Sequence, residues 1–492
     1  MDGSSVTPDI IRDRIFIEGR WIEGAARRRF AVDDPASART LAEIPDCGAE
    51  DARAAADAAH RALPAWRGRT AADRARILKR WHALILERGE DLARLMSLEQ
   101  GKPLRESRGE IDYAAAFVEW FAEEARRAYG DVIPAPQAGR KIIVVKEPVG
   151  VVAAITPWNF PAAMLARKAA PALAAGCTVV AKPAEDAPLS SLALAHLADL
   201  AGLPAGALNV VTASRARASE VVDEWLADFR VRKLTFTGST AVGKHLARES
   251  AGTLKRVSLE LGGNAPFIVF DDADLEAAAA GLVAAKFRNA GQTCICPNRV
   301  FVHEAVVDRF TALLEGKVRA LRVGPGTEEA TEIGPLINER AVAKVEEHIA
   351  DAAARGARVV LGGVRCAVAN QKDGRFFEPT IIVGVTPQMR LSSEETFGPV
   401  VPISTFRDEG DVVRLANDTP YGLAAYFYTR DAVRIWRVAD ALETGMIAIN
   451  DFALSSEVAP FGGVKASGYG REGSHYGLDE YLQTKYLLQG GL

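Results

Sequence analysis

The sequence predicts an α/β protein built from two successive sheet-containing units, and three observations carry this prediction. From residue 142 onward, short β-rich runs alternate with Ala-rich stretches of helical character, which is typical of a parallel sheet covered by helices. The same alternation returns beyond residue 265. The chain has 492 residues, of which 48% are hydrophobic, so it is long enough to bury two or three substantial cores.

The elements are expected in the following order. Residues 51–129 are rich in Ala, Arg, Glu and Leu, and their apolar residues recur at intervals of three and four, which predicts surface helices. The expected strands of the first unit are "IIVVKEPVGVVAAI" (142–155), "CTVVAKP" (177–183), "LNVVT" (208–212) and "KLTFTG" (233–238). Those of the second unit are "APFIVF" (265–270), "RVFVHE" (299–304), "RVVLGG" (358–363) and "VVPISTF" (400–406). Because no low-complexity linker separates them, we expect the units to pack tightly.

The charge distribution favours small-molecule partners. The formal net charge is -4, from 60 basic and 64 acidic residues spread along the chain, so no basic stripe is available for a nucleic acid or an anionic membrane. The N-terminal "MDGSSVTPDIIRDRIF" lacks a basic start followed by an apolar run, and no apolar stretch reaches the roughly 18 residues that cross a bilayer. We therefore expect a cytoplasmic protein.

The number and spacing of the cysteines indicate neither a set of structural disulfides nor a metal site. They stand at positions 47, 177, 294, 296 and 366. An odd and sparse set does not resemble a disulfide framework, which fits a reducing compartment. Cys294 and Cys296 are close in sequence, but no second Cys or His pair accompanies them, so we expect no metal site.

A Gly-rich turn follows one of the expected strands. In "KLTFTGSTAVGKHLARE" the strand is followed by Gly238, Ser239 and Thr240 and then by a helix, which directs the N–H groups of a helix N-terminus at an anion. The segment nearly matches a phosphate-binding NTPase loop, but His245 stands where a magnesium-binding hydroxyl is needed. The G-x-G-x-x-G spacing of dinucleotide sites is also missing. A glycine required only by a tight turn explains the segment equally well.

A carboxylate ends another expected strand. "SLELGGNAPFIVF" places Glu260 directly before Leu261 and two glycines. Small apolar neighbours would remove water from the carboxylate and raise its pKa toward the range useful for a general base. A strand-end glutamate in solvent is the alternative at this single position.

Seven motifs together resemble the aldehyde dehydrogenase superfamily over nearly the whole chain. They are "TPWNFP" (156–161), "KPAED" (182–186), "FTGSTAVG" (236–243), "LELGGNAP" (259–266), "GQTCIC" (291–296), "EETFGPV" (394–400) and "PFGGVKASGYGREG" (460–473). "RNAGQTCIC", "MLARKAAPALAAGC" and "LSSEVAPFGGVKASG" are most similar to the succinate-semialdehyde dehydrogenase branch. The resemblance implies two Rossmann-type α/β domains plus a small β oligomerisation element. The implied divisions are 1–129, 154–264 and 467–480 for NAD(P) binding, 265–466 for catalysis, and 130–153 and 481–492 for oligomerisation.

The resemblance also implies the catalytic residues. Cys294 would be the nucleophile, because a thiolate is a soft nucleophile that can later leave. The amide of Asn159 and the backbone N–H of Cys294 would hold the thiohemiacetal oxyanion. After hydride transfer, Glu260 would activate the water that hydrolyses the thioester. Taken alone, Asn159 could equally cap the backbone of its turn.

A nicotinamide cofactor is implied by the same motifs. The expected cofactor-binding residues are Thr156, Pro157, Trp158, Lys182, Glu185, Gly238, Ser239, Gly243, Leu261, Glu395 and Phe397. We expect NAD in preference to NADP, because Glu185 would accept hydrogen bonds from the ribose hydroxyls and repel a 2′-phosphate.

The expected substrate is a short aldehyde with a carboxylate at its far end, succinate semialdehyde first and glutarate semialdehyde second. By resemblance, Arg167, Arg288 and Ser455 face the substrate tunnel, where an arginine fork would bind the carboxylate. A broad aliphatic aldehyde dehydrogenase is the alternative if these arginines are structural. A coenzyme-A-acylating enzyme would not need Glu260, and a non-catalytic relative would have lost Cys294 or Asn159.

Two further expectations concern assembly and redox chemistry. The segments "RIFIEGRWIEG", "GRKIIVVKEP" and "YLQTKYLLQGGL" resemble the family's assembly elements, so we expect a homodimer or homotetramer. We expect Cys294 to work alone in catalysis and Cys296 to be dispensable. A disulfide between them would be strained and easily reduced, and the resemblance suggests that such oxidation switches the enzyme off reversibly. Cys296 could equally be a small packing residue.

Overall fold

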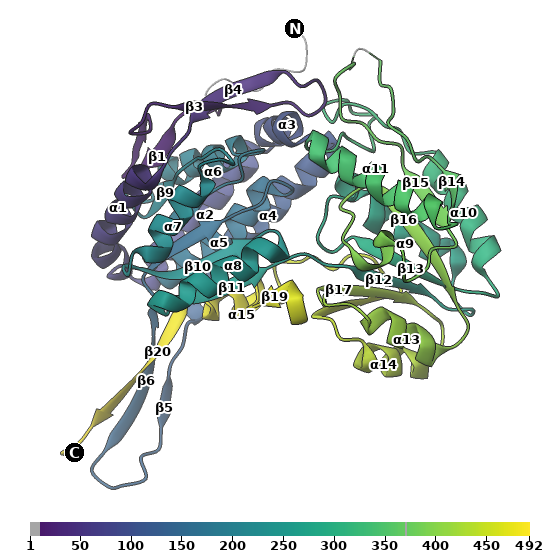
Figure 1. The fold of residues 1–492 in the computed structure, drawn as a ribbon. Helices are drawn as coiled ribbons and strands as arrows, with labels where there is room; N and C mark the ends of the chain where they lie inside the picture. The colour runs from purple at the N-terminus through teal and green to yellow at the C-terminus, as the bar shows by residue number, and fades with distance from the viewer. Residues whose placement is uncertain (1–9, 370) are drawn as a thin grey trace.

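The computed structural model describes residues 10–369 and 371–492. Residues 1–9, which form most of the N-terminal segment considered above as a possible leader, lie outside this description. Within the described residues, an eight-stranded and a seven-stranded sheet form two α/β units, and a three-stranded arm projects from the first (Figure 1). The remaining pair is β3 (Arg29–Asp33) with β4 (Thr40–Pro45).

The first unit is built on the eight-stranded sheet. In spatial order its strands are β19 (Gly468–Tyr469), β11 (Arg256–Glu260), β10 (Val231–Thr237), β7 (Val151–Ile155), β8 (Thr178–Lys182), β9 (Leu208–Val210), β1 (Ile15–Ile17) and β2 (Arg20–Ile22). The five strands from β11 to β9 are parallel. Its helices are α1 (Ala49–Arg67), α5 (Pro161–Ala175), α6 (Leu189–Leu200), α7 (Ala218–Ala227), α8 (Thr240–Ser250) and α15 (Ser474–Asp479).

Helices cover this sheet on both faces. Val152 and Ala154 of β7 belong to a core shared with α5 and α6, whereas Val151, Ala153 and Ile155 belong to a core shared with α1 and α7. A strand buried on both sides has no polar face, which explains the continuous apolar run in the sequence.

The helices predicted between residues 51 and 129 are confirmed. After α1 come α2 (Ala71–Glu87), α3 (Gly89–Gln100) and α4 (Leu104–Glu124), followed by the 3-10 turn η1 (Ala125–Arg127). Thr70 caps the first turn of α2 by accepting a hydrogen bond from Asp73 N, and α3 ends where Gly101 adopts a φ of 90°.

The second unit is built on the seven-stranded sheet. Its spatial order is β14 (Arg358–Leu361), β15 (Thr380–Val383), β16 (Val400–Phe406), β13 (Pro297–His303), β12 (Ala265–Val269), β17 (Ala424–Tyr428) and β18 (Met446–Ile449). Its helices are α9 (Leu275–Phe287), α10 (Val307–Arg319), α11 (Glu339–Ala354), α12 (Arg390–Ser393), α13 (Glu409–Asn417) and α14 (Ala432–Ala441). The α/β class predicted for both units is therefore confirmed.

The arm is a three-stranded antiparallel sheet. It consists of β5 (Asp131–Ile133), β6 (Lys141–Pro148) and β20 (Leu482–Gln489). The sequence run 142–155, taken above as one strand, is in fact two: β6 ends at Pro148 in the arm and β7 begins at Val151 in the large sheet. Gly150, with a φ of 129°, makes the change of direction between them. The expected boundary at residue 153 therefore falls inside β7.

One of the three expected assembly segments lies elsewhere. "RIFIEGRWIEG" forms the hairpin of β1 and β2 at the edge of the eight-stranded sheet, where Phe16 pairs with Val210. The other two segments, β6 and β20, pair along eight residues each and form the arm.

Candidate active site

Four neighbouring parallel strands bring expected site residues to one edge of the first sheet. Lys182 and Glu260 are the last residues of β8 and β11, and Thr156 and Gly238 directly follow β7 and β10. The carboxyl ends of parallel strands meet at one edge of a sheet, which is where ligands bind in open α/β folds. Motifs that are up to about a hundred residues apart in sequence are thus adjacent.

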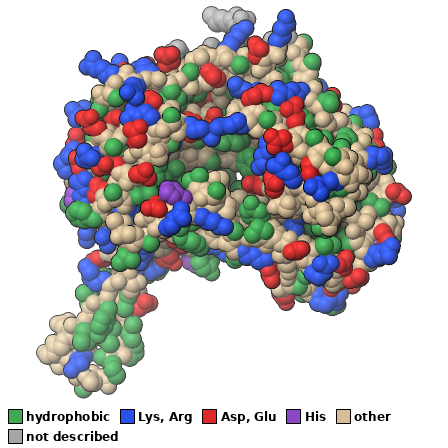
Figure 2. Space-filling model, viewed as in Figure 1, with side chains coloured by type: hydrophobic (Ala, Val, Ile, Leu, Met, Phe, Trp, Pro, Cys, Tyr) green, Lys and Arg blue, Asp and Glu red, His purple; other side chains and the backbone are tan. Residues whose placement is uncertain are grey.

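A cleft of about 450 Å³ lies at this edge, between the two units. Figure 2 shows this face of the molecule hollowed there. The expected site residues that line the cleft are Pro157, Trp158, Asn159, Gly238, Ser239, Glu260, Leu261, Cys294, Glu395 and Phe397. The structure therefore brings together all three expected catalytic residues. Arg215, Arg340 and Lys344 also line it, although no motif had indicated them.

Cys294 lies in a loop with an unusual backbone. Asn289 and Ala290, within the turn η3 (Arg288–Gly291), have φ values of 52° and 54°. The Gln292 side chain holds this loop, because its Nε2 donates to Asn289 O at 3.1 Å and its Oε1 accepts from Ile337 N at 2.9 Å. Residues in this region of φ are strained, and such strain persists only where surrounding contacts fix it.

Burial controls the ionisation of Cys294. It raises the pKa of the thiol to about 12, the carboxylate of Glu395 adds to the shift, and the positive charge of Arg167 opposes it. At neutral pH the thiol is therefore protonated, and its ionisation depends on charges that lie nearby.

Asn159 is held from both its side chain and its backbone. Its Nδ2 donates to Gln292 O at 3.0 Å, and its carbonyl accepts from Asn289 Nδ2 at 3.0 Å and from Lys102 Nζ at 2.7 Å. It does not cap helix α5, so the capping alternative is wrong. Because one amide hydrogen is used, the second remains available for an oxyanion.

The support for Asn159 was not visible in the sequence. Lys102 is fully buried, pairs with the equally buried Glu110, and lies 3.9 Å from the Phe160 ring centroid. A lysine and a glutamate eight residues apart in a helical segment are normally solvated, so no local pattern predicts that this pair is buried.

Glu260 is buried rather than exposed, which rules out the solvent-exposed alternative. The residue is 3% exposed, and neither carboxylate oxygen accepts a hydrogen bond from any described residue. Burial, followed by the nearby Glu472 carboxylate, raises the pKa of Glu260 well above its ordinary value. Arg167 and Lys168 act in the opposite direction. This environment is the one that a general base needs.

The Gly-rich turn begins helix α8 as the sequence predicts. Ser239 Oγ accepts a hydrogen bond from Val242 N at 3.4 Å and caps the helix. A Cβ at Gly243 would lie 2.3 Å from Leu261 Cδ2, so a larger residue there would require the Leu261 side chain to move. Ser239, at the N-terminus of α8, lines the cleft.

A second group of expected cofactor residues joins Trp158 of the first unit to Glu395 and Phe397 of the second. The rings of Trp158 and Phe397 meet edge to face, with centroids 5.6 Å apart. Glu395 accepts a hydrogen bond from Gly263 N at 3.1 Å, and burial raises the pKa of its carboxyl to about 7.

Two expected cofactor residues at the carboxyl ends of β7 and β8 are buried and are not among the residues that line the cleft. Lys182 is 4% exposed, and its Nζ donates to Pro183 O at 3.1 Å and lies 4.0 Å from Glu185. Thr156 Oγ1 is buried without a hydrogen-bond partner among the described residues. A buried hydroxyl without a protein partner fits a ligand that carries hydroxyl groups, such as the ribose of a dinucleotide.

Two of the three expected substrate residues share a smaller cavity. Arg288 and Ser455 line a space of about 240 Å³ together with Thr293, the neighbour of Cys294. Arg288 stacks over Phe160 at 4.7 Å. Arg167 does not line this cavity.

Arg167 instead has a partner within the protein. It is 2% exposed, its Nη2 lies 2.8 Å from Glu472, and its guanidinium lies 4.1 Å from the Phe461 ring centroid. Its Nε makes no hydrogen bond with any described residue. Glu472 comes from the last motif, whose contribution to the site was not foreseen.

Cys296 is the second thiol of the catalytic motif. All five cysteines are free thiols in the structure. Cys296 is fully buried, and its Sγ lies 3.5 Å from the Lys286 carbonyl oxygen, within hydrogen-bond reach.

Known proteins share both the sequence and this fold. A profile of the Aldehyde dehydrogenase family matches residues 21–487. Succinate-semialdehyde dehydrogenase (NADP(+)) from Escherichia coli is 56% identical over 482 residues, covering 98% of each chain. Glutarate-semialdehyde dehydrogenase from Pseudomonas aeruginosa is 54% identical, covering 98% of this chain and 99% of the other. The crystal structure of succinate-semialdehyde dehydrogenase from Burkholderia pseudomallei superimposes with a TM-score of 0.97 at 55% identity, covering 99% and 100% of the two chains. The chain therefore belongs to the aldehyde dehydrogenase family.

Proposed function

We propose that this enzyme oxidises succinate semialdehyde to succinate with a nicotinamide dinucleotide, and that glutarate semialdehyde is its second substrate. The observation that carries the proposal is the cavity that Arg288 and Ser455 share next to Thr293. A guanidinium and a hydroxyl in a small cavity match the far carboxylate of a short semialdehyde. The names of the relatives reported above support the same substrate class.

The catalytic residues act in sequence. Cys294 loses its proton and attacks the aldehyde carbon, while Asn159 donates its remaining amide hydrogen to the oxyanion that forms. The dinucleotide, when bound, supplies the hydride acceptor. Glu260 then takes a proton from the water that hydrolyses the thioester on Cys294. Burial of Glu260 supports this role, because a base with a raised pKa accepts a proton more readily.

Residues of both units would hold the dinucleotide. Lys182 and Glu185 would bind the adenosine ribose, Ser239 and the N-terminus of α8 would bind the pyrophosphate, and Glu395 and Phe397 would flank the nicotinamide half. We propose NAD in preference to NADP, because Glu185 would accept hydrogen bonds from both ribose hydroxyls and repel a 2′-phosphate.

The substrate assignment is tested by a differential experiment. Arg288→Ala should lower kcat/KM for succinate semialdehyde about ten- to a hundredfold, the cost of roughly 1.5–3 kcal/mol for losing a charge-assisted contact. Butanal has no carboxylate, so its kcat/KM should change by less than about threefold. Arg167→Ala should show the same difference if its unpaired Nε reaches the carboxylate. Equal losses on both substrates would make the arginines structural and favour a broad aliphatic aldehyde dehydrogenase.

Assembly into a homodimer or homotetramer is proposed from the arm. Its strands β5, β6 and β20 expose large apolar side chains, among them Val132, Ile133, Leu487 and Leu488, which are between 44% and 74% exposed. Figure 2 shows these hydrophobic side chains gathered on the projecting arm. Exposed apolar patches of this kind mark surfaces that a partner covers.

The reduced state of the cysteines is the basis for proposing a cellular compartment. All five cysteines are free, including the half-buried Cys294 on which catalysis depends. Free thiols of this kind persist where glutathione and thioredoxin keep them reduced, so we propose the cytoplasm. Among the described residues, no helix is both long and apolar enough to cross a bilayer.

A further inference from the structure

The turn between α3 and α4 lies where the two units meet. Both helices pack in the core of the first unit, yet a Cβ at Gly334 of the second unit would lie 2.1 Å from the Gly101 carbonyl oxygen. A Cβ at Gly326 would lie 2.3 Å from the Lys102 carbonyl oxygen, and the Gly326 carbonyl accepts a hydrogen bond from Leu104 N at 2.7 Å. Because these contacts leave no space for a side chain, the turn has a fixed position relative to the second unit.

Lys102, in this turn, contacts the segment that carries Asn159. Its side chain is fully buried, its Nζ donates to the Asn159 carbonyl oxygen at 2.7 Å, and it lies 3.9 Å from the Phe160 ring centroid. Its ion-pair partner Glu110 accepts hydrogen bonds from the backbone N–H groups of residues 162–163, in the first turn of α5, at 3.0 and 3.1 Å. The pair therefore holds both the Asn159 peptide and the start of the helix that follows it.

The same turn also holds the loop of the nucleophile. Gln100 Nε2 donates to Asn289 Oδ1 at 2.9 Å, and Gln100 Oε1 accepts from Lys102 N at 3.0 Å. Asn289 Nδ2 in turn donates at 3.0 Å to the Asn159 carbonyl oxygen, the oxygen to which Lys102 also donates. Asn159, on the first unit, and the loop that carries Cys294, on the second, are therefore fastened to one buried turn.

We propose that Lys102 is a positioning residue for the oxyanion. By holding the Asn159 peptide against the nucleophile loop, it directs the remaining amide hydrogen of Asn159 at the oxygen of the carbonyl group that Cys294 attacks. Alignment matters here, because a donor displaced by about 1 Å can lose on the order of a hundredfold in rate. Lys102 lines neither the cleft nor the smaller cavity, so it acts through Asn159. The inference rests on the proposed roles of Cys294 and Asn159.

The combined variant Lys102→Met with Glu110→Gln tests the inference. It removes both charges of the buried pair, so neither is left unpaired, and the glutamine oxygen can still accept from the first turn of α5. Two reactions of Cys294 are compared. Acylation by p-nitrophenyl acetate passes through an oxyanion before p-nitrophenolate leaves, whereas alkylation by iodoacetamide displaces iodide without forming one. The variant should be acylated about ten- to a hundredfold more slowly, whereas its alkylation rate should change by less than about threefold.

Lys255→Met is the matched control. Lys255 is 8% exposed, and its Nζ donates to the backbone carbonyls of Asp228 and Val231 at 2.6 and 2.8 Å. It directly precedes β11, at the opposite end of that strand from Glu260. It is therefore a buried lysine that binds main-chain carbonyls but does not line the cleft, and both rates should equal those of the wild type. Circular dichroism establishes that each variant is folded. Lys102→Arg is a second variant, since it keeps a cation beside Glu110 but changes where the donor lies, and it should show the same selective loss of acylation.

The Asn159→Ala background shows whether Lys102 acts through Asn159. Asn159→Ala alone should slow acylation about a hundred- to a thousandfold. Adding Lys102→Met and Glu110→Gln to it should slow acylation no further, because the donor that Lys102 positions is already absent. A further loss in this background, an unchanged acylation rate in the Lys102 variants, or equal losses of acylation and alkylation would each overturn the inference. An unchanged acylation rate in Asn159→Ala itself would instead overturn the proposed role of Asn159.

Discussion

At the scale of single residues, burial opposes the ionisation of both reactive groups. It raises the pKa of the Cys294 thiol and of the Glu260 carboxyl. Arg167 acts on both groups in the opposite direction. A protonated thiol reacts slowly with oxidants, so this arrangement protects the nucleophile between turnovers.

The Glu260 environment sets a pH dependence. Only the ionised carboxylate can take a proton from water, so hydrolysis of the thioester should be lost as pH falls through the raised pKa. Glu260→Gln should lower kcat about a hundred- to ten-thousandfold while a first-turnover burst of reduced cofactor remains. Rapid mixing measures the burst. The pH dependence is obtained by measuring kcat from about pH 5 to about pH 9. Loss of the burst would assign Glu260 to the first half of the reaction.

The variant Cys296→Ala tests whether a disulfide between Cys294 and Cys296 switches the enzyme off. The Cys296 thiol is fully buried and does not line the cleft, so Cys296→Ala should keep kcat within about twofold of the wild type. After peroxide treatment, dithiothreitol should restore the wild type but not the variant, because only a Cys294–Cys296 disulfide protects the nucleophile from further oxidation. Equal recovery of both proteins would remove the switch and leave Cys296 as a packing residue.

The sequence was sufficient to predict the site residues that lie within short motifs. Cys294, Asn159 and Glu260 lie in motifs, and the cleft unites them. The sequence was not sufficient to predict contacts between residues that lie far apart in the chain. Arg215 meets Glu185 only because β8 and β9 are neighbouring parallel strands, and Arg167 is paired with a residue from the last motif. Such pairs depend on which strands and loops are neighbours in the fold, and the spacing of residues within one segment does not predict this.

At the scale of elements, the apolar runs named as strands do form strands, whereas β3, β4, β15, β17 and β18 had not been predicted. The run 142–155 differs in extent, because Pro148 and Gly150 divide it between two sheets. Its first part carries Lys146 and Glu147 and lies in the exposed arm, whereas its second part, from Val151, is apolar and buried in the large sheet. The two charges, the proline and the glycine were the available signals of this division.

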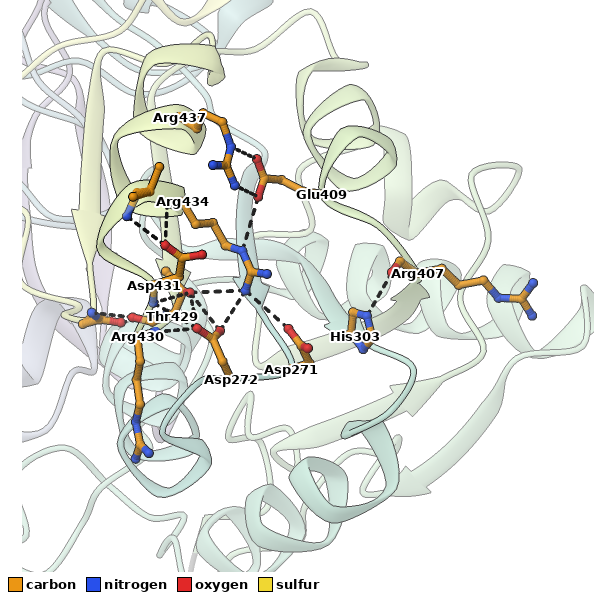
Figure 3. Close-up of polar contacts among 12 residues, drawn as sticks. Asp271, Asp272, His303, Arg407, Glu409, Thr429, Arg430, Asp431, Arg434 and Arg437 are labelled. Carbon is orange, nitrogen blue, oxygen red and sulfur yellow. Dashed lines mark hydrogen bonds and ion pairs between the residues drawn. The ribbon is translucent and has the colours of Figure 1, made fainter.

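An ion-pair network fastens helices α13 and α14 to the second sheet (Figure 3). Arg434 of α14 pairs with Asp272 at 2.9 Å, with Asp271 at 3.3 Å and with Glu409 at 3.2 Å. Its guanidinium also stacks over Phe270 at 4.6 Å. The side chain is 20% exposed, so these interactions are only partly screened by water.

Removal of Arg434 should destabilise the second unit measurably. Arg434→Ala leaves Asp272 and Glu409 without this shared partner, and we expect a loss of about 1–2 kcal/mol, which lowers Tm by a few degrees. Arg437→Ala is the matched control, because Arg437 is 54% exposed and pairs with Glu409 from the outside. Its Tm should stay within about 1 °C of the wild type. Thermal unfolding followed by circular dichroism compares the two, and equal shifts would show that the network adds no stability beyond its outer pair.

At the scale of the whole molecule, catalysis and assembly are assigned to separate parts. Every residue that lines the cleft belongs to the two α/β units of one chain. The arm carries none of them. Because the arm projects away from both units, its sheet is left without a covering layer in the single chain (Figure 1).

Both faces of the arm present apolar rows. Val132, Ile143 and Leu487 are directly opposite one another across the three strands, and so are Ile133, Ile142 and Leu488. Residues paired in this way share a face, and successive residues alternate between faces. The two uncovered apolar faces support the proposed assembly, in which a second copy of the chain would supply an identical surface.

Charged substitutions on one row test this assembly. Val132→Lys combined with Leu487→Lys places two cations on a single face, so the interface should open and light scattering should report the mass of a smaller species. Val433→Lys is the matched control, because Val433 is 67% exposed on α14, far from the arm in sequence and in the fold. Circular dichroism establishes that each variant is folded. Since none of the residues that line the cleft lies on the arm, the dissociated enzyme should keep the preference of the wild type for succinate semialdehyde over butanal. An unchanged mass would show that the interface does not include this row. Loss of the preference for succinate semialdehyde would mean that assembly shapes the substrate cavity.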